Sequence, residues 1–336
     1  MAHVLVMGDG SWGTAFALLL LSKNHRVALW SYFPEQANTI RRENENKKFL
    51  PGIEIPDSIS ILHRELTVDF HQFDLIVNAV PTQFVRPVFH SVFSQTNSII
   101  PILSLSKGLE ISTRLRVSQI LHQITPKSPV LALSGPSHAE EVAQKLPTAV
   151  TLAGKNYALL EYWQNEISTD YFRIYTNSDL IGVEMAGALK NVIGLAAGMV
   201  DGLGFGDNTK SALITRGLAE ITRLTLNMGA QQETLYGLSG LGDLITTSIS
   251  RHGRNWKAGF IIGQGTKFQE YEKQTAMVIE GAYTVKAAIQ LAKEYSIEMP
   301  ITEQIYQVIY ENLSPRDAVL NLMTRAYKSE RFLAGG

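Results

Sequence analysis

The sequence predicts an α/β protein in which a parallel β-sheet domain is followed by a domain made only of helices. Three observations support this fold class. Short aliphatic runs alternate with helical stretches in about the first third of the chain, a glycine-rich turn follows the first run, and long helical patterns fill the C-terminal part. Strands separated by helices are typical of a parallel sheet with right-handed crossovers.

The expected strands are short, aliphatic and followed by Gly, Pro, Ser or Asn, which is typical of buried strands. They span residues 4–7, 27–30, 75–80, 99–105 and 130–133, with further strands expected at 149–152 and 172–175. Helices are expected at 14–22, 35–45, 113–123, 180–200, 210–228, 282–295, 302–310 and 315–324. Because the pattern changes after residue 177, we predict two domains, 1–178 and 179–336.

Composition excludes several classes of protein. The 336 residues include 30 Lys and Arg against 31 Asp and Glu, a balance that disfavours a nucleic-acid partner bound through a broad basic face. The chain has no cysteine, which excludes disulfides, thiolate metal sites and cysteine nucleophiles. The apolar run at 15–21 is too short to cross a bilayer, and no Lys or Arg precedes the first apolar segment as it would in a signal peptide. We expect a cytoplasmic protein with no stable membrane insertion.

The turn Gly8-Asp-Gly10-Ser-Trp-Gly13 follows the first strand and opens a helix, which is the context of a dinucleotide-binding fingerprint. Gly8 permits the tight turn, Gly10 lets a pyrophosphate approach, and Gly13 lets the helix pack closely on the strand. The helix N-terminus offers N–H groups to the phosphates. The pattern predicts a Rossmann-type domain, whereas a purely structural turn is the alternative.

The end of the second strand does not decide between NAD and NADP. NAD-preferring sites usually carry an acid there, but this chain reads Trp30-Ser-Tyr-Phe33, and the first acid is Glu35. We therefore expect NAD or NADP as the cofactor. Arg41 and Arg42 are more typical of a solvated helix face than of a phosphate clamp.

Two polar segments follow later strands at the same edge of the predicted sheet, where ligands bind in open α/β folds. Lys107 comes just after one strand, before Gly108, and is either a ligand contact or a solvated loop lysine. Ser137 and Glu140 have the spacing of a capping box, and His138 between them is expected to pack or to lie beside a cofactor.

The predicted helix at 180–200 is almost wholly apolar, yet it carries Lys190 and Asn191. Its glycines at 187, 194 and 198 indicate close contact with another helix or a ligand, because glycine costs about 1 kcal/mol in a helix interior. Burial lowers the pKa of a lysine, which suits proton transfer at neutral pH. A structural ion pair of Lys190 with Glu184 or Asp243 is the alternative.

Three further segments carry candidate residues. Asp243 is a single acid in a glycine-rich apolar stretch, and Glu280 precedes a glycine at a helix start. The segment Arg251-His-Gly253-Arg254-Asn255 is a compact basic cluster suited to a phosphate or carboxylate, because arginine offers forked donors. A solvated loop is the other interpretation of that cluster.

Taken in order, these segments resemble bacterial NAD(P)-dependent glycerol-3-phosphate dehydrogenases over almost the whole chain. The resemblance rests on GxGSWGTA, LSKGLE, LSGPSHAEEVAQKLPTAV, VEMAGALKNVIGLAAGMVDG, GLSGLGDL, GRN and VIEGA. It implies an all-helical substrate domain of the 6-phosphogluconate-dehydrogenase type after the Rossmann domain. It also implies hydride transfer between NAD(P)(H) and the pair dihydroxyacetone phosphate and sn-glycerol 3-phosphate, which supplies phospholipid synthesis.

The resemblance also implies roles for residues. Lys190 would be the proton acceptor or donor, with Lys107 and Asp243 as its catalytic partners. The substrate would contact Lys107, Gly135, Ser137, Lys190, Asn191, Asp243, Gly253, Arg254 and Asn255. The cofactor would contact Gly8, Gly10, Ser11, Trp12, Gly13, Tyr32, Lys107, Ala139, Arg254, Val278 and Glu280. The chain departs from the family pattern at Asp9, which could weaken pyrophosphate binding unless it points to solvent, and at Gly253 and Trp256.

Three other functions remain open from the sequence. A related β-hydroxyacid or ketopantoate-type dehydrogenase would take a carboxylate substrate on the same two-domain plan. A non-catalytic nicotinamide sensor would have no need of a proton donor at Lys190. A structural dimer could use the glycine-rich helix as its interface. We expect a small phosphate substrate and a homodimer.

Overall fold

The computed structural model describes residues 1–64, 68–93, 99–275, 277–327 and 329–330, and these fall into two compact units. The first unit comprises Met1–Ser106 and Val117–Leu180, and the second comprises Lys107–Arg116 and the chain from Ile181 onward. Segment Lys107–Arg116 thus leaves the sheet unit and packs with the helical unit. This excursion, in the middle of the N-terminal region, was not expected from the sequence.

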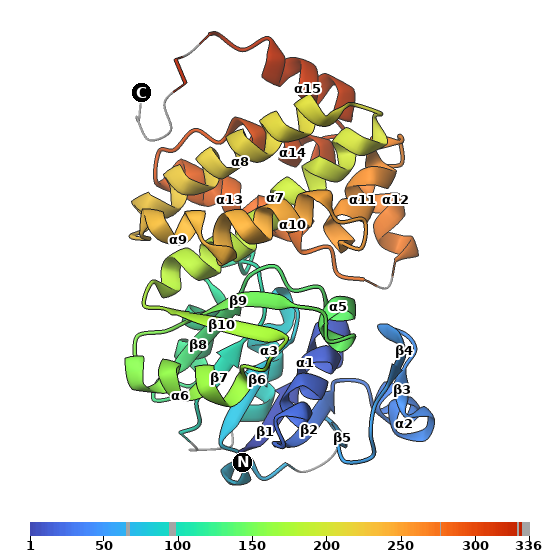
Figure 1. The fold of residues 1–336 in the computed structure, drawn as a ribbon. Helices are drawn as coiled ribbons and strands as arrows, with labels where there is room; N and C mark the ends of the chain where they lie inside the picture. Colours follow the sequence, from blue (N-terminus) through green and yellow to red (C-terminus); the bar gives the residue numbers. More distant parts are fainter. Residues whose placement is uncertain (65–67, 94–98, 276, 328, 331–336) are drawn as a thin grey trace. The chain divides into compact units, whose positions relative to one another are not determined.

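The first unit is built on a sheet that has eight strands among the described residues, in the order β10-β9-β8-β7-β6-β1-β2-β5 (Figure 1). Their bounds are β1 His3–Met7, β2 Arg26–Ser31, β5 Ser60–His63, β6 Leu75–Asn78, β7 Ile102–Ser104, β8 Val130–Ser134, β9 Thr148–Ala153 and β10 Phe172–Asn177. The predicted parallel sheet is confirmed, since all neighbouring strands pair in parallel except β8 and β9, which are antiparallel. The strand order changes direction between β1 and β6, which is the switch point where such sheets bind ligands.

Helices accompany the strands of this unit. They are α1 Ser11–Ser22, α2 Pro34–Glu43, α3 Thr82–Phe93, α4 Val117–Ile124, α5 Ala139–Ala143 and α6 Tyr157–Ile167, with a 3-10 turn at Phe70–Gln72. A small hairpin, β3 Glu45–Asn46 and β4 Leu50–Glu54, follows α2. The sequence indicated neither α3, which contains Pro87, nor the hairpin. The helix expected at 113–123 begins only at Val117, because Arg114 has a left-handed backbone (φ 62°).

The second unit contains only helices as regular elements among its described residues (Figure 1). They are α7 Leu180–Gly202, α8 Asp207–Asn227, α9 Gln232–Tyr236, a π-helical turn Leu238–Gly242, α10 Asp243–Ile249, α11 Arg254–Gly263, α12 Phe268–Gln274, α13 Glu280–Glu294, α14 Pro300–Tyr310 and α15 Pro315–Met323. Helix α7 is long and apolar enough to cross a membrane by length and composition, but 89% of its most apolar window is buried inside the protein. It forms part of the core of this unit together with α8, α13 and α14.

The glycines of α7 provide a close helix–helix contact. A Cβ atom on Gly198 or Gly202 would clash with backbone of α11, and one on Gly259 of α11 would clash with the carbonyl of Leu195 on α7. Gly194 lies against the side chain of Thr247 on α10. The prediction of close contact is confirmed for Gly194 and Gly198, and the neighbour in each case is another helix.

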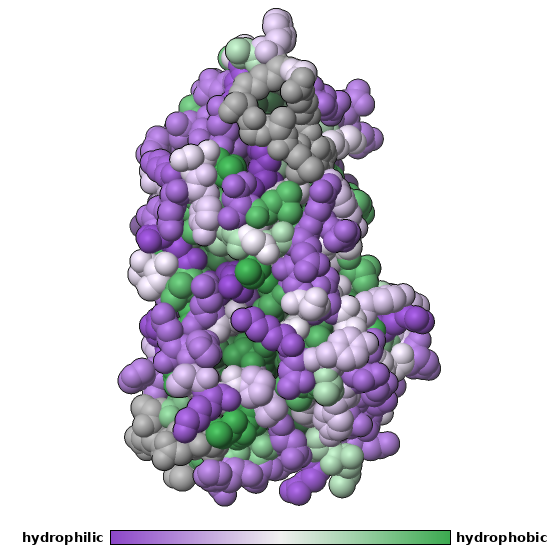
Figure 2. All heavy atoms as spheres, turned by 90° about the vertical axis from the view of Figure 1, so that its left-hand side faces the viewer, coloured by the Kyte–Doolittle hydropathy of each residue, from purple (hydrophilic) through white to green (hydrophobic). Residues whose placement is uncertain are grey.

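The surface carries polar and apolar side chains side by side. Figure 2 shows one face on which hydrophilic residues surround small hydrophobic patches. Such scattered apolar side chains are normal on a folded protein.

Glu220 of α8 is a buried acid that caps another helix. Its carboxylate accepts hydrogen bonds from the N–H groups of Ile301 (2.7 Å) and Thr302 (3.2 Å) and from the Thr302 hydroxyl, all at the start of α14. The side chain is 2% exposed, and burial raises its pKa from 4.5 to about 7 against the opposing hydrogen bonds. The folded protein therefore favours the protonated acid more strongly than the unfolded chain does.

This shift predicts how stability changes with pH. The contribution of Glu220 to the free energy of unfolding is fully present below pH 4.5 and is lost as the pH rises through about 7. At about 1.4 kcal/mol per pH unit, the total loss is up to roughly 3 kcal/mol. We expect Glu220→Gln to flatten the decline in unfolding free energy between about pH 5 and pH 7.5, as measured by urea denaturation. Glu303→Gln, an exposed acid in the first turn of α14, should leave the decline intact. An unchanged slope in Glu220→Gln would contradict the assignment.

Candidate functional site

Three charged residues of the second unit form a buried cluster. Asp243, the first residue of α10, accepts a hydrogen bond from the Lys107 Nζ at 2.7 Å on one oxygen and from the Lys190 Nζ at 2.7 Å on the other. The Asp243 side chain is 3% exposed, that of Lys190 10% and that of Lys107 17%. The structure therefore brings together the three residues predicted to be catalytic, and of the two partners considered for Lys190 it selects Asp243.

Burial and the neighbouring charges together shift the pKa of two members of this cluster. Burial lowers the pKa of Lys190 to about 8, with the Lys107 charge and Arg254 adding to the decrease and Asp243 opposing it. Burial alone would raise the pKa of Asp243, but the ammonium groups of Lys107 and Lys190 hold it below its usual value. At neutral pH the cluster therefore holds an ionised carboxylate and a lysine that can exchange a proton.

Asn191 and Asn255 form a chain of hydrogen bonds beside the cluster. The Asn191 amide donates to the carbonyl of Lys107 (3.0 Å) and accepts from the Asn255 amide (3.0 Å), whose own oxygen accepts from the N–H of Gly281 (2.9 Å). Both asparagines are less than 10% exposed. They fix the Lys107 segment and the start of α13 against α7 and α11, and their predicted contact with substrate stays a prediction.

The basic cluster at the start of α11 is more open. Gly253 is the N-cap of α11 and Arg254 is its first residue, exposed to solvent but near enough for its charge to lower the pKa of Lys190. Trp256 is buried, donates its indole N–H to Asp201 (2.7 Å) and stacks on Phe260. Trp256 therefore has a structural role, whereas Arg254 and Arg251 are exposed cations of this segment, and the charge of Arg254 reaches Lys190.

Glu184 of α7 forms a different ion pair from the one considered for it. It pairs with Arg116, and both side chains are largely buried. Arg116 ends the segment that crosses into the second unit, where it also bridges with Leu109. The sequence did not predict the Arg116–Glu184 ion pair, because an arginine in a loop before a helix gives no sign that its partner lies far along the chain.

The glycine-rich turn of the first unit has the geometry that a pyrophosphate site requires. Gly8 has a φ of 115°, and a Cβ there would press on the backbone of Ala79, while a Cβ on Gly13 would clash with the carbonyl of Gly8. Above Gly10, by contrast, nothing lies within 4 Å of where a Cβ would be. Gly10 is also the N-cap of α1, with no side chain bonded to the helix start. The backbone is thus open to a ligand at the position where the fingerprint requires it.

Two aromatic residues predicted to line the cofactor lie on the same unit. Trp12, in the first turn of α1, packs on Phe16, and its indole Nε1 is buried with no hydrogen-bond partner in the described part of the chain. Tyr32 follows β2 and is 40% exposed, beside Phe33 at 60% exposed. An unpaired buried donor and an exposed ring at this edge fit a bound dinucleotide.

Asp9 does not point to solvent. Its side chain belongs to a residue that is 8% exposed, and its carboxylate accepts a hydrogen bond from the hydroxyl of Ser31 at 2.8 Å. Burial raises the pKa of Asp9, although the Ser31 hydrogen bond opposes that change. Asp9 therefore does not adopt the solvent-facing orientation that would leave pyrophosphate binding undisturbed.

The segment after β8 corrects another expectation. Ser137 donates to the carbonyl of Gly135 (2.9 Å) instead of capping α5, whose N-cap is His138, so the capping box is wrong. Gly135 has a φ of 141° and lies against Val150. Ala139 begins α5 and belongs to an apolar cluster that also packs Trp12. Gly135 and Ser137 lie in the first unit, and their contact with substrate stays a prediction.

Two cofactor candidates belong to the second unit. Val278 is partly buried just before α13, and Glu280 is the first residue of that helix and 9% exposed. Glu280 thus lies one residue from the Gly281 N–H that binds Asn255. This places Glu280 next to the amide chain of the cluster, and its role toward the cofactor stays a prediction.

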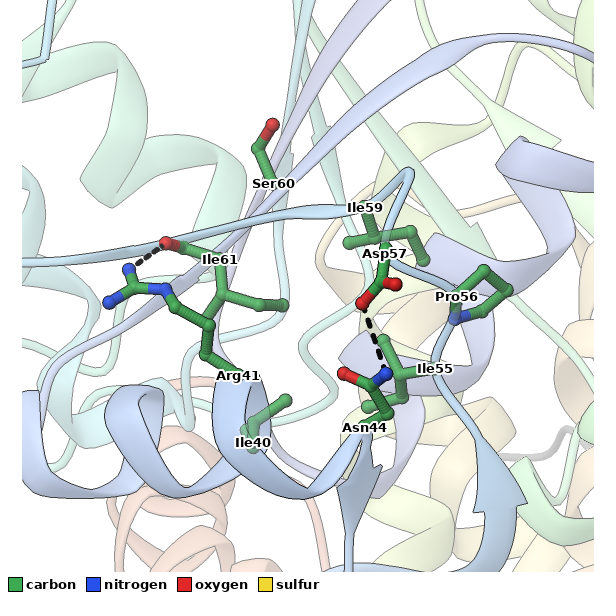
Figure 3. A pocket seen from close by; sticks show the side chains of 9 residues that line it. All are labelled: Ile40, Arg41, Asn44, Ile55, Pro56, Asp57, Ile59, Ser60 and Ile61. Atoms are coloured by element: carbon green, nitrogen blue, oxygen red, sulfur yellow. Dashed lines mark hydrogen bonds between the residues drawn. The ribbon is translucent and has the colours of Figure 1, made fainter.

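A surface hollow of the first unit is lined by other residues than these. It measures about 320 Å³ and is lined by α2, β5 and the loop before β5 (Figure 3). Arg41 lies along it and donates to the carbonyl of Ile61 (2.6 Å), while Asn44 donates to Asp57 (3.0 Å). Arg42 extends into solvent beside Glu43. Neither arginine is arranged as a phosphate clamp. This agrees with the sequence, which favoured a solvated helix face for both.

Comparison with known proteins covers nearly the whole chain. Residues 3–160 match the model of the NAD-dependent glycerol-3-phosphate dehydrogenase N-terminus, and residues 179–320 match that of its C-terminus. A glycerol-3-phosphate dehydrogenase [NAD(P)+] of Geobacillus thermodenitrificans is 46% identical over 98% of this chain and 97% of its own length. The crystal structure of the glycerol-3-phosphate dehydrogenase of Coxiella burnetii superposes with a TM-score of 0.91 at 35% identity, covering 96% of this chain and 99% of that one.

More distant structures share the fold alone. A ketopantoate reductase from Ralstonia eutropha superposes with a TM-score of 0.61 over 94% of this chain and 99% of its own, at 11% identity. The similarity to the alternative class of dehydrogenase is thus one of architecture. It carries no information on substrate.

Proposed function

We propose a residue-level mechanism from the premise that this chain belongs to the NAD-dependent glycerol-3-phosphate dehydrogenase family. The protein is an oxidoreductase that interconverts dihydroxyacetone phosphate and glycerol 3-phosphate with NAD(P)(H). The observation that carries the mechanism is the buried cluster of Lys190, Asp243 and Lys107. Its chemistry matches the proton transfer that this reaction needs.

The glycine-rich turn is the proposed site of the dinucleotide. Gly8, Gly10 and Gly13 hold the β1–α1 turn open, and the N–H groups at the start of α1 face a pyrophosphate. Trp12 and Tyr32 supply a buried donor and an exposed ring. When bound, the dihydronicotinamide supplies a hydride to the carbonyl carbon, and the oxidised ring takes it back.

Lys190 is the proposed proton donor and acceptor. In the reductive direction its ammonium hydrogen-bonds the carbonyl oxygen, and its proton passes to that oxygen as the carbon gains the hydride. The product is the secondary alcohol, and Lys190 is left neutral. In the oxidative direction neutral Lys190 accepts the hydroxyl proton. A pKa of about 8 makes both forms accessible near neutral pH.

Asp243 and Lys107 position this proton transfer. The Asp243 carboxylate fixes the Lys190 Nζ at 2.7 Å and raises the pKa that burial lowers, so the lysine remains a competent acid. Lys107 shares the carboxylate and adds a second positive charge beside the developing oxyanion. Holding both cations before substrate arrives removes the cost of arranging them during reaction.

Arg254 is the proposed phosphate contact, because it is an exposed guanidinium beside the cluster and at a helix N-terminus. We expect Arg254→Ala to raise the KM for dihydroxyacetone phosphate about 10- to 100-fold with a smaller change in kcat, since a hydrogen bond to a charged group is lost. Steady-state kinetics measures both constants. Lys257→Ala removes an exposed cation one turn further along α11 and should change neither. A change confined to cofactor affinity would show that the phosphate binds elsewhere.

One assay tests the proposed function. Oxidation of NADH or NADPH is followed by nicotinamide absorbance with dihydroxyacetone phosphate as substrate, and with ketopantoate as a carboxylate control. We expect turnover with dihydroxyacetone phosphate and none with ketopantoate. No oxidation of either cofactor with dihydroxyacetone phosphate would overturn the proposal.

The remaining features of the proposal concern the protein in its surroundings. We propose domains 1–178 and 179–336, with the segment Lys107–Arg116 of the first domain packed in the helical unit. We also propose a cytoplasmic homodimer and a supply of glycerol 3-phosphate to phospholipid synthesis. The absence of cysteine suits a reducing compartment. Exposed apolar side chains on α15, Leu320 and Met323, suit contact with a second copy. Sedimentation of the purified protein as a monomer would contradict the homodimer.

A further inference from the structure

Asp9 places a carboxylate at the end of β2, although it belongs to the turn after β1. The register pairs Met7 with Trp30, and the N–H of Gly8 donates to the carbonyl of Trp30 at 2.9 Å. The residue after Gly8 therefore lies beside the residue after Trp30. The 2.8 Å hydrogen bond from the Ser31 hydroxyl to the Asp9 carboxylate closes this pair.

The backbone of Asp9 is fixed by neighbouring side chains. Its carbonyl accepts a hydrogen bond from the amide of Asn46 at 2.7 Å, and Asn46 is fully buried. The same amide donates to the hydroxyl of Thr14. The carboxylate is thus held in one position before any ligand binds, and it is not a mobile loop side chain.

The end of β2 is the place where dinucleotide-binding sheets distinguish their two cofactors. An acid there accepts hydrogen bonds from the ribose hydroxyls of NAD, whereas an arginine there accommodates the 2′-phosphate of NADP. In this chain β2 runs out as Ser31-Tyr32-Phe33, with neither an acid nor a cation of its own. Asp9 provides the missing acid from the adjacent strand.

We propose that Asp9, oriented by Ser31, makes this enzyme select NAD(H) over NADP(H). The carboxylate accepts a hydrogen bond from the adenosine ribose and repels a 2′-phosphate. The inference rests on the proposed dinucleotide site at the glycine-rich turn, and it adds the class of dinucleotide which that site takes.

Two cations near the end of β2 would attract a 2′-phosphate and so oppose the effect of Asp9. Lys48 is close enough to stabilise the ionised form of Asp9, and the guanidinium of Arg64 lies 4.6 Å from the centre of the Tyr32 ring. Both side chains are exposed, so solvent and salt screen their attraction for a phosphate. Asp9 is 8% exposed, and its repulsion is screened less. The balance therefore favours the cofactor without the 2′-phosphate.

The test is direct binding to the full-length protein, measured by titration calorimetry with NADH, NADPH, ADP-ribose and 2′-phospho-ADP-ribose. The two fragments lack the nicotinamide, so they report on this edge independently of catalysis. We expect NADH to bind at least tenfold more tightly than NADPH, and ADP-ribose more tightly than its 2′-phosphorylated form. The same preference should appear in kcat/KM.

Variants separate selectivity from structure. Asp9→Asn keeps an acceptor for Ser31 but removes the charge, and we expect it to narrow the NADH preference to about threefold or less, mainly through tighter NADPH binding. Ser31→Ala should reduce the preference for NADH over NADPH in part, because it removes the hydrogen bond that orients the Asp9 carboxylate. Asp74→Asn is the matched control. Asp74 precedes β6 at the opposite edge of the same sheet, where it accepts from the N–H of His3, and its substitution should leave the preference unchanged.

The outcomes are distinguishable. A wild-type protein that binds NADPH as tightly as NADH would overturn the selectivity, and so would an unchanged preference in Asp9→Asn. If Asp9→Asn does not fold, an unchanged preference in Ser31→Ala overturns the role of the pair. Failure to bind any of the four ligands would overturn the dinucleotide site itself and this inference with it.

Discussion

Lys190→Ala should reduce kcat in both directions by about 10²–10⁴-fold while leaving the affinity for NADH nearly unchanged. The expected loss is that of a positioned general acid and base. The lysine is buried on α7 in the second unit, whereas the proposed dinucleotide contacts at the β1–α1 turn lie in the first. Steady-state kinetics and NADH titration of the same preparation measure the two effects. Near-normal turnover would exclude Lys190 as the proton-transfer group.

Two further variants separate proton transfer from charge. Lys190→Arg keeps a positive charge beside Asp243, but a guanidinium does not release its proton at accessible pH, so we expect it to remain nearly inactive. Lys210→Ala is the matched control, because Lys210 also pairs with an aspartate of the second unit, Asp201 at 2.6 Å. It should retain turnover. Loss of activity in Lys210→Ala equal to that of Lys190→Ala would point to a general structural effect.

The pH dependence of the wild-type enzyme also tests Lys190 as the proton-transfer group. Because the pKa of Lys190 is lowered to about 8, the protonated acid is present below that pH and the neutral base above it. Reduction of dihydroxyacetone phosphate should therefore slow as the pH rises through about 8. Oxidation of glycerol 3-phosphate should accelerate over the same range.

Asp243→Asn should lower both activity and stability. Without the carboxylate, the ammonium groups of Lys107 and Lys190 lose the acceptor that they share, and breaking a buried pair in this way typically costs about 3–5 kcal/mol. Asp243 also raises the pKa of Lys190, so its loss should move the alkaline limit of the reductive reaction to lower pH by about 1–3 pH units. Urea denaturation and a pH profile of kcat measure these two effects.

The pH profile distinguishes positioning from simple destabilisation. Asp201→Asn removes a carboxylate that binds Lys210 and Trp256 in the same unit, and it should lower stability without moving the profile. Asp243→Glu restores the charge and should return the profile toward that of the wild type even if turnover stays low. A profile that is unchanged in Asp243→Asn would show that the carboxylate does not control the lysine.

Much of the fold was predictable because it depends on local patterns. Strands β1, β2, β6 and β8 are aliphatic runs, and α7 is an unbroken apolar helix, so their positions follow from periodicity within one or a few residues. Elements whose residues carry weaker patterns were missed. Helix α3 contains Pro87, and the β3–β4 hairpin is short and polar, so neither shows a period strong enough to identify.

The candidate site was predictable in its residue types but not in its pairings. Lys190 stood out as a cation in an apolar helix, and Asp243 as an acid in a glycine-rich stretch. Their distance along the chain is large, and two acids were equally plausible partners for the lysine. The packing of α7 on α10 brings Asp243 to Lys190, whereas the segment ending at Arg116 neutralises Glu184.

Residues that are near one another along the chain are enough to predict the class of fold, the dinucleotide fingerprint and the family resemblance. The partners of the buried charged residues, in contrast, depend on the tertiary structure. It carries Lys107 into the helical unit, where it shares Asp243 with Lys190, and it turns Asp9 onto Ser31 at the end of the neighbouring strand. A buried charge needs a partner within a few ångströms, and only the folded backbone sets which distant residue comes that close.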